Sequence, residues 1–261
     1  MIDIGVNINH SYYLDDLATT LYDSAQAGVS DLVCIASDLE ESQTIMVLCE
    51  QHDMLWYTIG CHPHHAKDWQ QDSLAQARKL IAQSNPVAIG ETGLDFNRNY
   101  STPAQQVYAF EQQIELALEF DLPLYLHERD AHDEMLKHLE KYPALTSKSI
   151  VHCFTGNPEQ LKNYVSLGLS IGITGWVCDE RRGQDLQDSL PFIPLDKLHL
   201  ETDAPYLLPR NIRPRPKRNH PKYLPYVAEE VAKLKNMSVN ELIQQTRKNS
   251  QTLFGIKPRT I

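Results

Sequence analysis

Four polar residues have the types and spacing needed for metal-assisted chemistry: Glu91, His127, His152 and Asp203. Each lies at or near the end of a short apolar run, and the four are separated by 36, 25 and 51 residues. Two imidazoles and two carboxylates, with water in the open positions, can bind a divalent cation. One such residue alone is more often a structural histidine or a helix cap. Four together favour a shared metal site.

A second histidine cluster and two amides accompany these residues. His62 and His64 belong to a run that ends at His65. We predict that this run contacts an anionic substrate, while a metal-binding role or a solvated loop remains open. Asn7 and Asn9 are either weak ligands and water holders or turn residues.

Eight short apolar, β-branched runs must position these side chains, and each is typical of a strand. They span residues 2–8, 31–37, 55–62, 87–95, 123–127, 149–154, 169–174 and 198–203. Stretches with helical spacing alternate with them. Helices are predicted over 103–120, with Thr102 as the cap, and over 133–142, 223–234 and 239–254.

Eight strand–helix alternations in 261 residues predict a single α/β domain, a (β/α)₈ TIM barrel over 1–261. A doubly wound open sheet is the alternative, but no G-x-G-x-x-G motif opens the first helix. Barrel enzymes carry their active sites at the carboxyl ends of the strands, where the four polar residues lie. The hydrophobic content of 42% excludes a disordered chain, a collagen and a coiled coil.

The charge is distributed unevenly. The formal net charge is −10, so the surface as a whole repels nucleic acids, and a polyanionic partner must be held by a metal or a local basic patch. Residues 204–228 contain no Asp or Glu and form such a patch, unless they are merely a solvated loop. Its cations are Arg210, Arg213, Arg215, Lys217, Arg218 and Lys222.

The cysteines and the amino terminus indicate the compartment. Five scattered cysteines without a C-x-x-C pair are typical of reduced thiols. The first residues show no secretory signal, and no apolar run approaches the length of a membrane span. We therefore expect a cytoplasmic protein, without membrane contact and monomeric.

Several motifs resemble those of the TatD-type metal-dependent deoxyribonucleases. They are Gly90-Glu91-Thr92-Gly93-Leu94-Asp95, His152-Cys153-Phe154-Thr155-Gly156, Glu201-Thr202-Asp203-Ala204-Pro205-Tyr206 and Gly60-Cys61-His62-Pro63-His64. The stretch over 172–183 resembles the founding member of that family more than its paralogues. The resemblance covers nearly the whole chain, in order.

The resemblance implies an amidohydrolase-like barrel that hydrolyses phosphodiesters. It implies a magnesium-dependent 3′–5′ exonuclease that prefers single-stranded DNA and RNA, with a role in the repair of oxidatively damaged DNA. By the same resemblance, Glu91, His127 and His152 are metal ligands, and Asp203 is a ligand or the base beside it. Most members have His-x-His where this chain has Asn7-Ile8-Asn9. A one-metal site, or a second metal recruited by the substrate, fits these weaker ligands better.

These residues suggest a mechanism. The metal polarises a phosphodiester oxygen and lowers the pKa of a bound water, which Asp203 orients or deprotonates. Phosphate contacts are expected from His62, His64, Arg210, Arg213 and Arg215. The aromatic candidates for stacking on unpaired bases are Tyr206, Phe96, Phe154 and Trp176.

The metal identity and two other functions stay open. Mg²⁺ is expected from the family, whereas the imidazole ligands also suit Mn²⁺ or Zn²⁺. A metal-dependent lactonase or amidase on the same barrel is one rival, although a small neutral substrate needs no arginine-rich loop. A non-catalytic nucleic-acid-binding barrel is the other.

Overall fold

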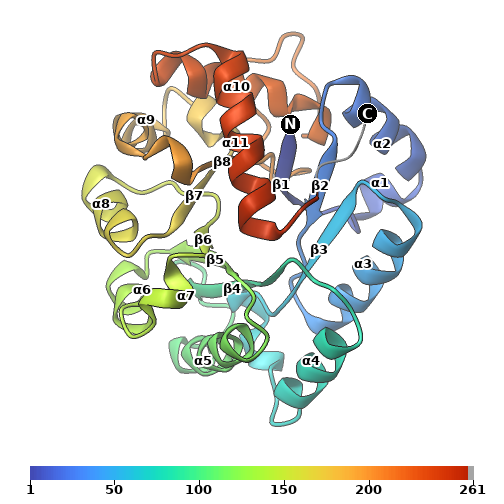
Figure 1. Cartoon of the computed structure of the whole chain (residues 1–261), viewed down its shortest axis with the longest axis vertical. Coiled ribbons are helices and arrows are strands. Elements are labelled where there is room, and N and C mark those ends of the chain that lie inside the picture. Colours follow the sequence, from blue (N-terminus) through green and yellow to red (C-terminus); the bar gives the residue numbers. More distant parts are fainter. Residues whose placement is uncertain (258–261) are drawn as a thin grey trace.

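The computed structural model describes residues 1–257, and eight parallel strands in chain order surround its centre (Figure 1). Neighbouring strands pair in sequence order, and β8 returns to β1, because Val6 and Ala204 form a parallel bridge. The predicted barrel and all eight predicted strands are confirmed. They are β1 Ile2–Val6, β2 Asp31–Cys34, β3 Leu55–Ile59, β4 Ala88–Asp95, β5 Leu124–Arg129, β6 Ile150–Val151, β7 Ser170–Ile173 and β8 Leu198–Leu200.

Helices surround the strands, as the alternating pattern predicts. The described α-helices are α1 Ser11–Leu14, α2 Leu17–Gln26, α3 Leu39–Gln51, α4 Ser73–Ala82, α5 Pro103–Glu119, α6 His132–Leu139, α7 Pro143–Thr146, α8 Pro158–Ser166, α9 Gln184–Ser189, α10 Leu224–Leu234 and α11 Val239–Phe254. The predicted Thr102 cap is confirmed, and Gln105 completes a capping box with it. Among the helices of residues 1–257, none is long and apolar enough to cross a membrane.

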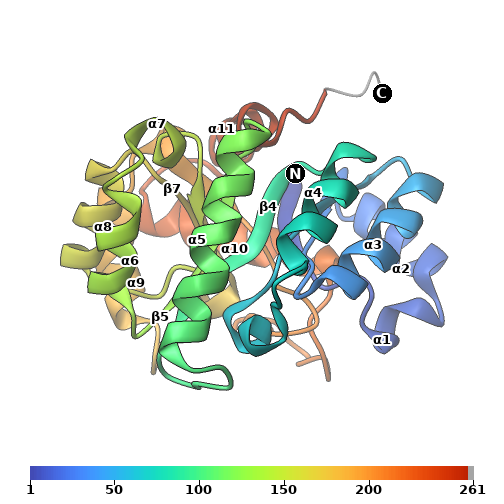
Figure 2. The ribbon, with the colours of Figure 1, turned by 90° about the horizontal axis from the view of Figure 1, so that it is seen from below.

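One end of the barrel is filled with apolar side chains. Ile2 and Ile4 of β1 belong to a buried cluster that includes Tyr125 of β5. Phe254, at the end of α11, and Ile256 pack onto the same cluster. In Figure 2, α11 lies at the same end as the amino terminus, and the segment after β8 extends at the opposite end. The open cleft that a substrate can enter therefore lies at the carboxyl ends of the strands.

A buried histidine joins α11 to the barrel. His199 of β8 is 1% exposed, and its Nδ1 lies 2.9 Å from Oγ of Ser250 in α11. Burial lowers the pKa of His199 to about 3, from an ordinary value of 6.5. A histidine that stays neutral in the folded protein stabilises it above pH 6.5, and this stability is lost as the pH falls toward 3.

We therefore expect the free energy of unfolding to fall by about 3 kcal/mol through His199 alone between pH 6.5 and about pH 4. His199→Gln keeps a polar group facing Ser250 but does not titrate. Urea denaturation at several pH values gives the free energy of unfolding. Between pH 6.5 and about pH 4, the slope of this free energy against pH should be smaller by about 1.4 kcal/mol per pH unit in the variant than in the wild type. An unchanged slope would mean that His199 is not the titrating group.

Candidate metal centre

The carboxyl ends of the strands surround an open cleft of about 480 Å³. The four residues that the spacing singled out, from β4, β5 and the segments after β6 and β8, all line it. Three further predicted contacts, His62, His64 and Tyr206, line the same cleft. The fold thus brings these side chains from five separate parts of the chain to one place.

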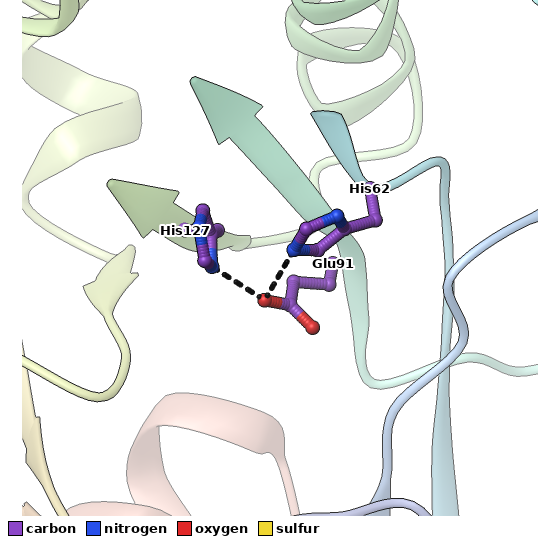
Figure 3. Close-up of side chains that lie close together, drawn as sticks. All are labelled: His62, Glu91 and His127. Atoms are coloured by element: carbon purple, nitrogen blue, oxygen red, sulfur yellow. Dashed lines mark hydrogen bonds and ion pairs between the residues drawn. The ribbon is translucent and has the colours of Figure 1, made fainter. Parts of the chain in front are cut away.

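Glu91 lies at the centre of this group. Its Oε1 is 2.7 Å from Nε2 of His152, 2.9 Å from Nδ1 of His127 and 3.3 Å from Nε2 of His62. Figure 3 shows the His62 and His127 rings converging on this oxygen. Burial alone would raise the pKa of Glu91, but His152 and His62 hold it well below its ordinary value. One ionised carboxylate oxygen therefore faces three imidazoles.

The side chains around Glu91 fit a divalent cation. His62, Glu91 and His127 each offer one ligand atom, and these three atoms lie within 4.8 Å of one another. Two imidazole nitrogens and a carboxylate oxygen are a common ligand set for a catalytic metal with open positions. His62 is thus placed among the possible ligands, although its sequence position favoured a substrate contact. Burial lowers the pKa of His62 to about 4, so its ring is neutral at pH 7, as a ligand must be. Burial alone would also lower the pKa of His152, but Glu91 and Glu201 hold it well above its ordinary value, so this ring must release a proton before it can bind a cation.

Asp95 contacts two of the histidines around Glu91, and the sequence analysis assigned it no role. Its Oδ2 lies 2.8 Å from Nε2 of His64 and 3.3 Å from Nε2 of His127. His127 therefore directs one ring nitrogen at Glu91 and the other at Asp95. A second carboxylate of this kind fixes the orientation of a ligating histidine. The sequence signal for Asp95 was its position four residues after Glu91 on the same predicted strand, because residues two or four positions apart on a strand face the same side.

Glu201 supports His152 in the same way and was also missed. It is fully buried, accepts a 2.7 Å hydrogen bond from the Tyr125 hydroxyl, and lies 3.4 Å from Nδ1 of His152. Gly5 and Gly172 make room for it, because a Cβ on either would lie within 2.4 or 2.5 Å of a Glu201 carboxylate oxygen. Glu201 belongs to the predicted run over 198–203 that ends at Asp203, and a carboxylate in that position is the sequence signal that could have identified it.

Asp203 lies where β8 meets β1. Its main-chain N–H donates to the carbonyl of Gly5 at 2.9 Å, and its Oδ1 accepts a 3.0 Å hydrogen bond from the Asn7 side chain. Burial raises the pKa of Asp203 to about 7. Asn7 stands where most family members are expected to have the first histidine of His-x-His, and it holds this carboxylate instead.

The arginines after β8 lie apart from the metal centre and are held by local contacts. Nε of Arg210 is 2.7 Å from Oδ2 of Asp179, and Arg213 donates to the carbonyls of Arg210 and Ile212. Arg215 lines a hollow together with Arg210. Of the predicted substrate contacts, these three therefore form a separate cationic surface, outside the lining of the cleft.

Comparison with known proteins identifies the relatives of this chain. The family model described as "TatD related DNase" matches residues 2–255. The "3'-5' ssDNA/RNA exonuclease TatD" of Erwinia amylovora is 46% identical over 259 residues, covering 98% of this chain and 100% of that protein. The protein of that name from Yersinia pseudotuberculosis is 47% identical over 263 residues, with the same coverage.

Two solved structures bear on the fold. The TatD homologue YjjV of Escherichia coli superposes with a TM-score of 0.91 at 29% identity, covering 98% of each chain. The β-aspartyl dipeptidase of Fervidobacterium islandicum matches with a TM-score of 0.65 at 13% identity, covering 98% of this chain and 74% of that one. The second likeness concerns the barrel alone.

Proposed function

Because the chain belongs to the TatD-related deoxyribonuclease family, we propose that it is a metal-dependent 3′–5′ exonuclease of single-stranded DNA and RNA. The observation that carries the metal dependence is the single Glu91 oxygen that faces three imidazole nitrogens at the carboxyl end of the barrel. The polarity and the substrate class come from the relatives' names.

In this proposal, His62, Glu91, His127 and His152 hold the cation. When bound, a divalent cation supplies Lewis-acid polarisation of the phosphodiester and makes a nearby water more acidic. The chain's own residues prepare for this chemistry, because Asp95 orients His127 and Glu201 orients His152. The ligands are thus held by a second layer of carboxylates.

Asp203 is proposed as the group that orients the attacking water and takes its proton. Its raised pKa suits a base that works near neutral pH. Asn7 restrains the carboxylate through the 3.0 Å hydrogen bond, so that one Asp203 oxygen remains free for the water. Asp203 can also act as a further ligand, and the metal affinity of its amide variant separates the two roles.

Phosphate binding is assigned to His64 in the cleft and to Arg210, Arg213 and Arg215 beyond it. On a chain of net charge −10, these arginines supply the local positive field that a polyanionic strand requires. A small neutral substrate has no use for them, which favours the nuclease over a lactonase or amidase.

The finer assignments follow from the same relationship. We propose Mg²⁺ as the resident cation, with Mn²⁺ and Zn²⁺ as alternatives that the imidazoles also suit. We propose a single domain and a monomer, because all four proposed ligands come from one chain. All five cysteines are free, which supports a reducing cytoplasmic location. We propose the repair of oxidatively damaged DNA as the cellular role.

The test is hydrolysis of a 5′-labelled single strand by chelator-treated protein, with Mg²⁺, Mn²⁺ and Zn²⁺ added separately. We expect a ladder that shortens from the 3′ end with at least one cation and no cleavage without any. Release of the labelled 5′ nucleotide at once, without a ladder, would contradict the polarity. Complete absence of cleavage, with turnover of an ester or lactone instead, would favour the small-molecule hydrolase.

A further inference from the structure

A groove leads away from the metal centre across the ends of β5, β6 and β7. The cleft shares Glu128, Arg129 and Thr155 with a second hollow, and that hollow shares Trp176 and Arg182 with a third. Hollows that share lining residues lie next to one another. The groove therefore runs from the metal centre, past Phe154 and Trp176, to the arginines after β8; its far end is lined by Arg210 and Arg215.

The middle of the groove holds a tryptophan–arginine pair. The Arg182 guanidinium lies 4.6 Å from the centre of the Trp176 ring, and the indole N–H donates to the Arg182 carbonyl at 3.2 Å. The Arg182 side chain is nevertheless 59% exposed. Planar, accessible groups of this kind are what unpaired bases stack on, and such stacking tolerates any base.

A buried carboxylate fixes the arginines of the groove. Asp179 is 3% exposed; its Oδ2 lies 2.7 Å from Nε of Arg210 and 3.1 Å from Nε of Arg182. Nε of Arg181 is 3.9 Å from the other oxygen, Oδ1. Three guanidinium groups around one carboxylate leave an excess of positive charge at this end of the groove, whereas the second hollow is lined by Glu128, Asp130 and Asp185 beside Arg129 and Arg182. The Asp179 carboxylate holds two of the guanidinium groups in place before any ligand arrives.

Gly183 allows the loop over residues 176–183 to fold back tightly on itself. A Cβ on Gly183 would lie 2.6 Å from the Trp176 carbonyl oxygen and 2.8 Å from that of Asp179. Any other residue would therefore push the loop open and separate Trp176 from Arg182. The sequence itself thus favours one loop conformation in the absence of a ligand, as expected of a preformed binding surface.

We propose that this groove binds the part of a single strand that lies 5′ of the scissile phosphodiester, with Trp176 and Arg182 stacking a base and Arg182 and Arg210 facing the phosphates. The assignment of direction rests on the proposed function, because a 3′–5′ exonuclease holds the 3′ end at the metal centre. The groove then makes the enzyme prefer long strands to dinucleotides.

The experiment compares kcat/KM for a dinucleotide with kcat/KM for a strand of about a dozen nucleotides. Trp176→Leu and Arg182→Gln should each lower the long-to-short ratio about tenfold. Arg182→Gln should also reduce the salt dependence of long-strand binding by about one unit of slope. Lys248→Gln, which removes an exposed cation of α11 outside the groove, is the matched control and should leave the ratio unchanged.

Binding of a labelled, cleavage-resistant strand, followed by fluorescence anisotropy without added metal, tests the groove independently of hydrolysis. Both groove variants should weaken the Kd for the long strand about tenfold, and Lys248→Gln should not. Equal Kd values and equal ratios in all variants would overturn the groove. If wild-type protein cleaved no strand but the Kd values still differed, the nuclease assignment would fail while the groove stood.

Discussion

Glu91→Gln is expected to lower the hydrolysis of single strands by about a thousandfold or more. The amide has the volume of the carboxylate but lacks the charge that faces His62, His127 and His152. A neutral oxygen among three imidazoles binds a divalent cation far more weakly. Single-turnover cleavage of a labelled strand, measured over a range of cation concentrations, gives the loss of rate and of metal affinity together.

The same variant has a readout that does not depend on catalysis. A cation that binds only the folded wild-type protein raises its Tm in a concentration-dependent way, and Glu91→Gln should abolish most of this rise. Glu119→Gln, at an exposed glutamate of α5 that pairs with Arg78, is the matched control and should keep both the rise and the activity. Retention of metal-dependent cleavage by Glu91→Gln would show that the cation is held elsewhere.

The barrel was predictable because apolar runs report burial directly. Every predicted run overlaps a strand, yet most strands are shorter than their runs, whereas β5 continues two residues beyond its run, to Arg129. Ile8 is fully buried but lies beyond the end of β1 at Val6, and Ile35 likewise lies beyond the end of β2. The Ile35 N–H still donates to the Val6 carbonyl at 3.0 Å, although the residue is outside β2. Burial thus continues beyond the ends of the strands, so hydrophobicity alone overestimates strand length.

The metal centre was predictable in part, for a related reason. Polar residues that end apolar runs are conspicuous, and this singled out His127 and His152. Asp95 lies on β4 with Glu91, and Glu201 follows β8 two residues before Asp203. Their roles depend on which ring nitrogen of His127 and of His152 they face. His62 likewise required its 3.3 Å distance from Glu91. Distances between side chains on different strands are set by the closure of the barrel.

The second large effect is expected from Asp203→Asn. The amide oxygen can still accept the hydrogen bond from Asn7, so the position of the side chain should be kept while its ability to take a proton is lost. Loss of a general base lowers the rate by about a hundredfold to ten-thousandfold. We expect a loss of about a thousandfold in kcat, measured in single-turnover cleavage at saturating cation.

Metal affinity decides which of its two roles Asp203 has. If Asp203 acts as the base, the imidazoles and Glu91 still hold the cation in Asp203→Asn. The cation concentration that gives the half-maximal rate should then change by less than about tenfold, in contrast to Glu91→Gln. Asn7→Ala removes the side chain that positions the Asp203 carboxylate. Loss of a group that orients an active-site residue typically lowers activity, so we expect kcat to fall by about tenfold to a hundredfold. A kcat in Asp203→Asn within tenfold of wild type would instead assign the proton to another group that lines the cleft and is not among the proposed ligands.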